Sequence, residues 1–117
     1  MKTLQETFDI VLAHARKQKC HSRDSAGICR YRQDGKMCFA GPLIPDDKYD
    51  PSFETHAVWT MHGKAQNKVS ILIEDEGHNV DFVGKLQDIH DGHEVEEWEK
   101  AFQDLAIRFN LIYTAQL

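Results

Sequence analysis

The 117-residue sequence lacks the patterns that mark the commonest catalytic and membrane-bound classes of protein. It has no glycine-rich phosphate loop, no dinucleotide fingerprint and no GxSxG nucleophile elbow. No apolar run approaches the ~18 residues that span a bilayer, and the opening residues, MKTLQETFDI, lack the apolar core of a signal peptide. We therefore expect a non-enzymatic protein of the cytosol.

Cysteine is scarce, and its spacing does not match a common metal site. Eight residues separate each of the three cysteines from the next, whereas structural zinc sites usually place paired ligands about two to four residues apart. An odd number of cysteines in a reducing cytosol favours free thiols over a disulfide framework. No disulfide is expected.

Basic residues are outnumbered. The chain has 14 Lys and Arg against 19 Asp and Glu, which gives a net charge of -5. Proteins that bind nucleic acid without sequence preference need a surplus of positive charge to neutralise phosphates. A general role in nucleic-acid binding is therefore disfavoured, although a local basic patch is compatible with this balance.

The composition of the chain predicts one globular domain spanning residues 1–117. Its 41% hydrophobic residues can form a core without disulfides or metals, because folding alone becomes difficult only below ~40 residues. We predict an α+β fold in which a β-hairpin packs against three or more helices. The first and last helices are expected to supply most of the core.

Apolar spacing predicts these helices. Thr3 and Glu6 have the spacing of a capping box, and apolar residues then recur at intervals of three and four to about Lys17. A second amphipathic pattern runs from Asn79 to Gly92, and a third runs from Val95 to Phe109 and includes Trp98. The short link between the last two favours antiparallel packing.

Asp34-Gly35 is the clearest turn signal, because both residues tolerate the positive φ angles of a type I′ hairpin turn. The predicted strands are 28–32 and 36–40. With a two-residue loop, three side chains share one face: Cys29, Tyr31 and Cys38. A three-residue loop with a bulge would instead put the two thiols on opposite faces, and the sequence leaves both registers open.

Two further segments are ambiguous. Residues 42–59 contain three prolines and several acidic residues, which is typical of turns or short helices. Residues 67–77 have the β-branched content of a strand, but Asn67 and Gly77 suit the two ends of a short helix. We favour the helix.

A zinc site is the alternative to structural cysteines. Its candidate ligands are Cys29, Cys38, His90 and His93, with Cys20 and His21 nearby in the sequence. The preferred interpretation is that Cys29 and Cys38 are small buried hydrophobes, while His90 stabilises the C-terminal end of its helix. A lone His-Asp pair without further ligands on neighbouring helices is weak support for a metal.

Basic and aromatic residues alternate on the predicted hairpin. The candidate binding residues are Arg30, Tyr31, Arg32 and Lys36. Such a surface can bind phosphates or an acidic partner. The competing interpretation is that the arginines only solvate the outer face of a strand.

The central segment CRYRQDGKMCFAGPLIPDDKYDP and the later LQDIHD carry a family resemblance. The chain resembles small uncharacterised proteins encoded by phages, prophages and plasmids of proteobacteria, which share C-x-Y-R, a glycine turn, a second cysteine and a Leu-Ile-Pro-Asp stretch with tyrosine. It departs from them at Glu54-Thr55, where a glutamate-glycine pair is usual.

The resemblance implies a setting in which small proteins bind or inhibit a host protein, such as a defence enzyme. We therefore expect a non-enzymatic accessory protein without a cofactor, which acts on a host protein in the host cytosol. The second hypothesis is a zinc-binding module that uses the hairpin cysteines. The third is nucleic-acid binding through the basic hairpin.

Overall fold

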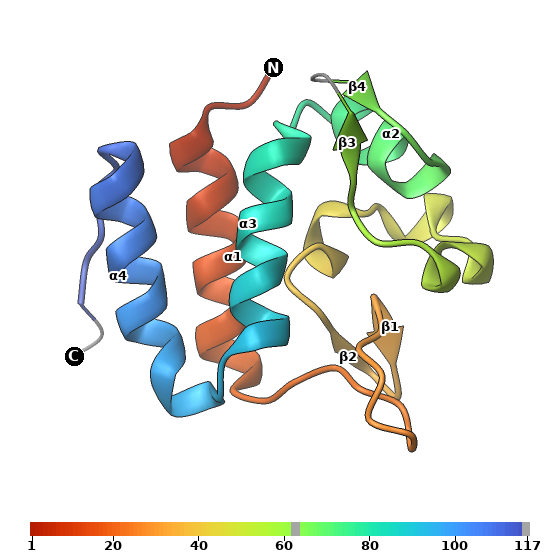
Figure 1. Ribbon diagram of the computed structural model, residues 1–117, viewed down its shortest axis with the longest axis horizontal. Helices are drawn as coiled ribbons and strands as arrows, with labels where there is room; N and C mark the ends of the chain where they lie inside the picture. Colours follow the sequence, from red (N-terminus) through yellow and green to blue (C-terminus); the bar gives the residue numbers. More distant parts are fainter. Residues whose placement is uncertain (62–63, 116–117) are drawn as a thin grey trace.

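Three helices lie side by side, and the shorter elements gather along one edge of this layer (Figure 1). The computed structural model describes residues 1–61 and 64–115. Its helices are α1 (Leu4–Gln18), α2 (Lys68–Asp75), α3 (Val80–Gly92) and α4 (Trp98–Phe109). Its strands are β1 (Arg32–Gln33), β2 (Lys36–Met37), β3 (Thr60–Met61) and β4 (Lys64–Ala65), and they form two antiparallel hairpins. The α+β prediction is confirmed.

The helices begin where the sequence predicts. The Thr3 hydroxyl accepts a hydrogen bond from the Glu6 amide at 3.1 Å, and the Glu6 carboxylate accepts one from the Thr3 amide at 3.0 Å. Asn79 caps α3 through the Phe82 amide at 3.0 Å. Each side chain satisfies a backbone amide that has no partner inside its helix. The first helix and the one after Asn79 are thus confirmed.

Residues 67–77 form a helix rather than a strand. The Asn67 side chain accepts a hydrogen bond from the Ser70 amide at 2.9 Å and so caps α2. Gly77, just beyond the helix, has a φ of 94°, which favours glycine. Short 3-10 helices occupy the proline-rich stretch, at Gly41–Leu43, Asp46–Lys48 and Pro51–Thr55.

The first hairpin has the two-residue loop. Arg32 lies opposite Met37 and Gln33 opposite Lys36, and the turn residues Asp34 and Gly35 have φ angles of 51° and 79°. The strands are much shorter than predicted, because the Tyr31 amide bonds to the Glu54 carboxylate instead of to the opposite strand and Cys29 pairs with Arg23.

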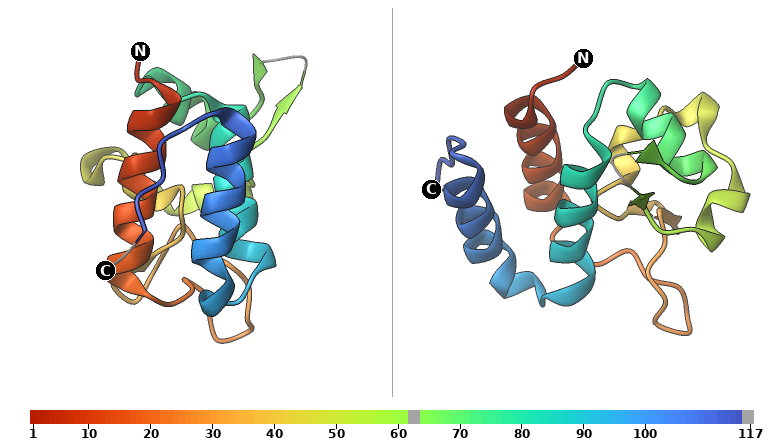
Figure 2. Two further views of the ribbon diagram at one scale, coloured as in Figure 1. Left: turned by 90° about the vertical axis from the view of Figure 1, so that its left-hand side faces the viewer. Right: turned by 45° about the horizontal axis from the view of Figure 1, so that its top comes forward.

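The second hairpin, β3–β4, has no counterpart among the predicted elements. Its strands are two residues long, and a two-residue strand is too short to show an alternating pattern in the sequence. It projects from the edge of the molecule beside α2 (Figures 1 and 2).

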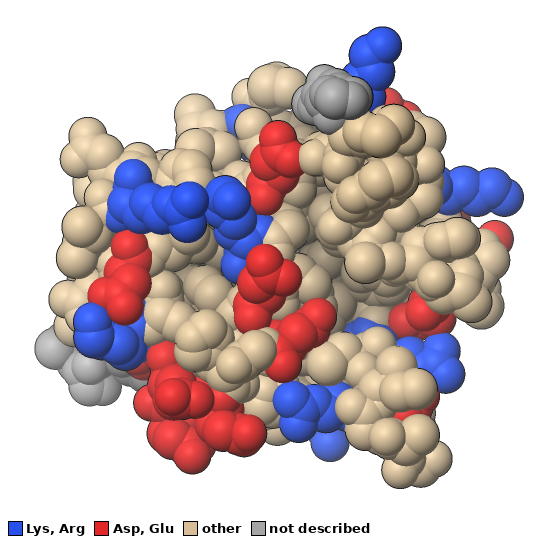
Figure 3. All heavy atoms as spheres, in the orientation of Figure 1, with Lys and Arg blue, Asp and Glu red and all other residues tan. Residues whose placement is uncertain are grey.

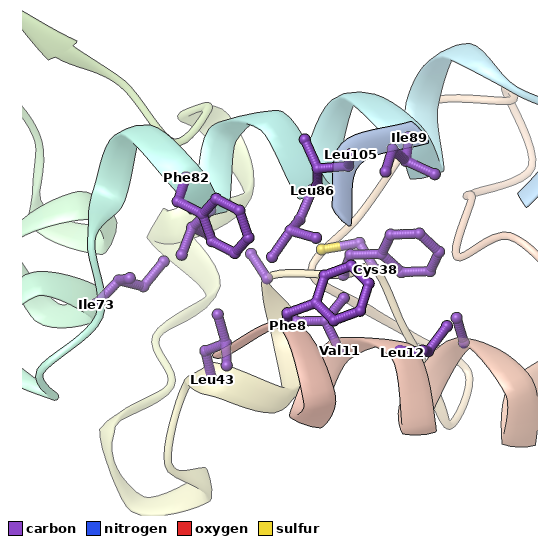
Figure 4. Close-up of a cluster of buried hydrophobic side chains, with 14 of the residues drawn as sticks. Phe8, Val11, Leu12, Cys38, Leu43, Ile73, Phe82, Leu86, Ile89 and Leu105 are labelled. Atoms are coloured by element: carbon purple, nitrogen blue, oxygen red, sulfur yellow. The ribbon is translucent and has the colours of Figure 1, made fainter. Parts of the chain in front are cut away.

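The core lies where α1, α3 and α4 meet the segment from residue 31 to 53. Figure 4 shows Cys38 among side chains of α1 and α3, including Phe8, Val11 and Leu86. The expectation that the first and last helices supply most of the core is wrong. They contribute fewer than half of the buried hydrophobic residues, whereas α3 and the 31–53 segment contribute more. The reason is position: α3 lies between α1 and the short elements and packs on both sides (Figure 2).

Candidate functional site

A polar hollow of about 190 Å³ lies between the first hairpin and α3. Three segments line it: the central segment with the two cysteines, the stretch after the prolines, and the LQDIHD part of α3. The lining residues are Cys29, Tyr31, Cys38, Glu54, Thr55, His56, Ala57, Gln87 and Asp91. The sequence singled out the hairpin cysteines and the His-Asp pair, and the fold places Cys29, Cys38 and Asp91 around one space, with His90 buried behind Asp91.

Asp91 contacts three neighbouring side chains at this hollow. Its Oδ1 accepts hydrogen bonds from His90 Nδ1 at 2.7 Å and from Gln87 Nε2 at 3.0 Å, and its carboxylate also contacts the thiol of Cys29. Burial acts to raise the pKa of Asp91, but the hydrogen bonds from His90 and Cys29 outweigh it and hold that pKa below its usual value. Asp91 is therefore an ionised acceptor.

His90 is fully buried, and its hydrogen bonds assign the ring proton. The backbone amide of Ser22, which can only donate, bonds to Nε2 at 3.0 Å. Nε2 therefore carries no proton, and the neutral ring holds its proton on Nδ1, where it is donated to Asp91. The ring also stacks on Trp98, with centroids 5.9 Å apart. His90 thus ties the loop at Ser22 to α3 and α4.

The predicted zinc ligands are only partly brought together. One ligand atom each of Cys29, His90 and Asp91 lies within 4.8 Å of the others. Cys38 lines the same hollow, but His93 lies elsewhere, beside Leu105 and Arg108. Zinc at His90 Nδ1 would need the proton moved to Nε2, where it would face the Ser22 amide. That conflict disfavours His90 as a ligand in this arrangement.

Neither Cys29 nor Cys38 has the lowered thiol pKa that a cysteine nucleophile needs. Burial raises the pKa of the Cys38 thiol to about 12. Burial also raises the pKa of Cys29, and its hydrogen bond to Asp91 raises it further. Because the thiolate is the reactive form, both groups are protonated and unreactive at neutral pH. This agrees with the interpretation of Cys38 as a small buried hydrophobe.

Glu54 closes the other side of the hollow. Its carboxylate accepts hydrogen bonds from the amides of Tyr31 at 2.8 Å and Arg32 at 3.1 Å, and also from the Tyr49 hydroxyl. Burial, followed by this bond, raises the pKa of Tyr49 to about 12. Glu54 thus joins β1 to the chain beyond the prolines.

The four candidate binding residues do not form one exposed surface. Tyr31 is buried, and its hydroxyl donates to the His56 carbonyl at 2.6 Å. Arg32 turns inward, donates to the Ile44 carbonyl at 2.8 Å and lies 4.8 Å from the Tyr49 ring centre. Arg30 pairs with Asp24 at 3.1 Å, and Lys36 is exposed. Tyr31 is therefore not available on the surface, and binding by the hairpin stays a prediction.

An exposed apolar surface lies at the opposite edge of the short elements. We call Trp59, Met61 and Ile71 the Trp59 surface; their exposed fractions are 52%, 48% and 46%. The Trp59 amide donates to the Ser70 hydroxyl at 2.9 Å, which joins the residue before β3 to α2. Figure 3 shows a largely uncharged surface over β3 and α2, with acidic groups along α3 beside it.

Sequence reasoning missed this surface. Of the two tryptophans, Trp98 belongs to a helical apolar pattern, but Trp59 belongs to none. A tryptophan outside every periodic element was the available signal, since large aromatics in such places are either buried by tertiary contacts or exposed for binding.

A groove separates Trp59 from α3, and we call it the Trp59 groove. It has a volume of about 210 Å³. One wall is formed by Val58, Trp59 and Thr60, and the other by Val80, Asp81, Gly84, Lys85 and Asp88. The Thr60 hydroxyl donates to Asp81 and so connects the walls.

Gly84 is unusual within this groove because nothing in the backbone requires a glycine there. It lies inside α3, its φ is not positive, and an added Cβ would meet only the Val58 carbonyl, at 3.9 Å. Glycine inside a helix is less stable than alanine by about 1 kcal/mol. The chain therefore keeps a less stable residue at a position that lines the groove.

Comparisons with family models, with curated proteins and with solved structures give no match for this chain. Among residues 1–61 and 64–115, no helix combines the length and apolar character needed to cross a membrane.

Proposed function

We propose that the chain is a non-enzymatic accessory protein of a phage or other mobile element, which binds a host protein in the cytosol through the Trp59 surface. The observation that carries the proposal is the half-exposed Trp59, with Met61 and Ile71 on elements joined to it. Tryptophan is enriched among the residues that contribute most to binding at protein interfaces. Large apolar side chains exposed on neighbouring elements are typical of a surface that binds another protein.

The residues around the polar hollow support an enzymatic function less well than the Trp59 surface supports protein binding. The Cys29 and Cys38 thiols are protonated, the His90 ring is held by Ser22 and Asp91, and Glu54 is held by two amides and a hydroxyl. A general base or nucleophile needs a group that is free to exchange a proton with a substrate. These contacts instead connect loops to helices.

The test is capture of a host protein by the purified chain, followed by measurement of affinity for the protein identified. We expect Trp59→Ala to weaken binding at least about tenfold, the effect of losing a central aromatic contact. Ile107→Ala is the matched control, because Ile107 is 73% exposed but lies on α4, at the far side of the molecule. Equal affinity of the Trp59 variant and the unmodified chain would refute the proposal.

Zinc binding is the second candidate, because Cys29, His90 and Asp91 are grouped. Elemental analysis of protein purified without added metal distinguishes the two. We expect no stoichiometric zinc and no change in the thermal midpoint of unfolding when zinc is added. The Ser22 amide donates to Nε2 of His90, so the ring proton stays on Nδ1, the nitrogen that zinc would need. Stoichiometric zinc that is lost in a Cys29→Ala variant would establish the metal site instead.

A further inference from the structure

The Trp59 groove has two different kinds of wall. Trp59 lies on one side, and Asp81 and Asp88 of α3 lie on the other. We propose that this groove receives an arginine or lysine side chain of the partner protein. The proposal rests on the proposed function, because the groove adjoins the Trp59 surface, and it names the chemistry that the partner must present.

The charges in the groove favour a cation. Asp81 and Asp88 are exposed, and neither belongs to any of the ion pairs formed among the described residues. Lys85 lies between them on the same helical face, four residues after Asp81 and three before Asp88. Two carboxylates and one ammonium leave the groove with a net negative charge, in a chain whose overall charge is -5. A basic partner side chain complements it.

The aromatic wall suits the same ligand. A guanidinium or ammonium group is attracted to the face of an indole when it lies within about 6 Å of the ring centre. The long apolar stem of arginine or lysine can cover apolar surface while its charged end reaches a carboxylate. Val58 and Val80 supply that apolar lining here. A basic side chain therefore suits both walls, whereas a purely apolar side chain would give no charged partner to Asp88 or to Asp81, whose Oδ1 accepts a hydrogen bond, among the described residues, only from the Thr60 hydroxyl.

Gly84 leaves room for such a side chain in the Trp59 groove, because glycine has no side chain of its own. An alanine would fit the fold at this position, since its Cβ would make only an ordinary contact with the Val58 carbonyl at 3.9 Å. Its methyl group would instead occupy space in the groove, which Gly84 lines. Retention of a helix-weakening residue where a stronger helix former fits is expected when the open space has a use.

Nuclear magnetic resonance titration of the full chain tests the proposal with blocked Gly-Arg-Gly and a matched Gly-Gln-Gly peptide. The two indole N–H signals of Trp59 and Trp98 serve as reporters, because Trp98 is buried. We expect Gly-Arg-Gly to shift the Trp59 signal in a saturable way and to leave the Trp98 signal unchanged. Gly-Gln-Gly should bind about threefold to thirtyfold more weakly, for loss of a cation–π contact and a charge pair. Equal shifts with both peptides would overturn the proposal.

Three variants make the test specific. Asp88→Asn should weaken Gly-Arg-Gly binding about twofold to fivefold, the range for one exposed charge pair, and Lys85→Gln should strengthen it. Gly84→Ala should raise the thermal midpoint and weaken binding together. A Gly84→Ala protein that is more stable but binds Gly-Arg-Gly as well as the unmodified chain would refute the assigned role of the glycine.

The same variants separate this inference from the proposed function. A captured host protein that needs Trp59 but binds equally well to Asp88→Asn and Gly84→Ala would leave the proposed function standing and refute the basic side chain. Gly-Arg-Gly binding that depends on Asp88, without any host protein whose affinity depends on Trp59, would support the groove and refute the proposed function.

Discussion

The two tryptophans report on two differently built halves of the molecule. Trp98 is 3% exposed and lies at the start of α4 against Phe39 and His90, within the layer of long helices. Trp59 is 52% exposed and precedes a two-residue strand among short elements. The long helices bury their apolar faces against one another and against the 31–53 segment, whereas the chain around Trp59 is joined to α2 by polar bonds such as those of Ser70 and Asn67. We therefore expect Trp98 to contribute more to stability than Trp59, and the exposed apolar side chains gather around Trp59.

The largest expected effect tests this contrast directly. Trp98→Ala should lower the free energy of unfolding by about 3–5 kcal/mol, the range for deleting a large buried aromatic side chain. Trp59→Ala should change it by no more than about 0.5 kcal/mol, because the side chain is half-exposed. Denaturant titration measures both. A loss below ~1 kcal/mol for Trp98→Ala would mean that α4 is not packed as described.

The next effect concerns the cysteines of the hairpin region. Replacing Cys29 and Cys38 together with alanine should cost about 1–3 kcal/mol, through lost burial and a small cavity. Nearly all of this loss should come from Cys38, which is 1% exposed, and little from the partly exposed Cys29. Partner binding should persist in both single variants. A double variant that folds normally but loses binding would show that the thiols act through chemistry rather than volume.

The arginines of the hairpin should differ from each other. Arg32→Ala should cost about 1–2 kcal/mol, because it leaves the Ile44 carbonyl without its charged donor and removes the contact with Tyr49. Arg30→Ala should cost less than about 1 kcal/mol, since its pair with Asp24 is partly exposed. Arg32→Lys is the control, because it keeps the charge but loses the planar fork of donors. Equal losses in thermal stability for the two alanine variants would contradict the inward placement of Arg32.

The smallest effect depends on pH and lies at the junction of the two halves. His78 is buried and bonds to the Thr7 hydroxyl at 2.7 Å, and burial, followed by the nearby Lys2, lowers its pKa below 6.5. The unfolded chain therefore binds a proton at His78 more readily than the folded chain. Stability is fully present above pH 6.5 and decreases as the pH falls through the lowered pKa.

Denaturant midpoints of the unmodified chain and of His78→Gln, measured at pH values on both sides of that window, check this prediction. The variant should lose part of the pH dependence, and the remainder belongs to carboxylates such as Asp91 and Glu99, whose pKa values are lowered. A variant with an unchanged pH profile would exclude His78 as a source of acid sensitivity.

The parts of the fold that could be predicted from sequence are those governed by neighbouring residues. The capping box at Thr3, the Asn79 cap and the Asp34-Gly35 turn depend on chemistry within about four residues, and each is present. The central position of α3 could not be predicted, because an amphipathic pattern shows that a helix has a buried face but not how many elements pack against it.

The candidate sites were harder to predict for the same reason. Cys29 and Asp91 contact each other although 61 residues separate them in the sequence, and the assignment of the His90 proton depends on the amide of Ser22, 68 residues away. The exposure of Trp59 depends on which elements fail to cover it, and no local pattern records that. Long-range contacts decide all three.

The carboxylate of Glu54 has a consequence for how copies of the chain behave when crowded together. Short strands at the margin of a fold present backbone amides to which a strand of another molecule can add, and such pairing is a common start of aggregation. Here one side chain takes the amides of both Tyr31 and Arg32, at the point where β1 begins. A foreign strand would have to displace a charged acceptor from two donors before it could pair. We therefore expect Glu54 to keep these two amides from pairing with a strand of another molecule, a contact that an apolar residue at this position could not make.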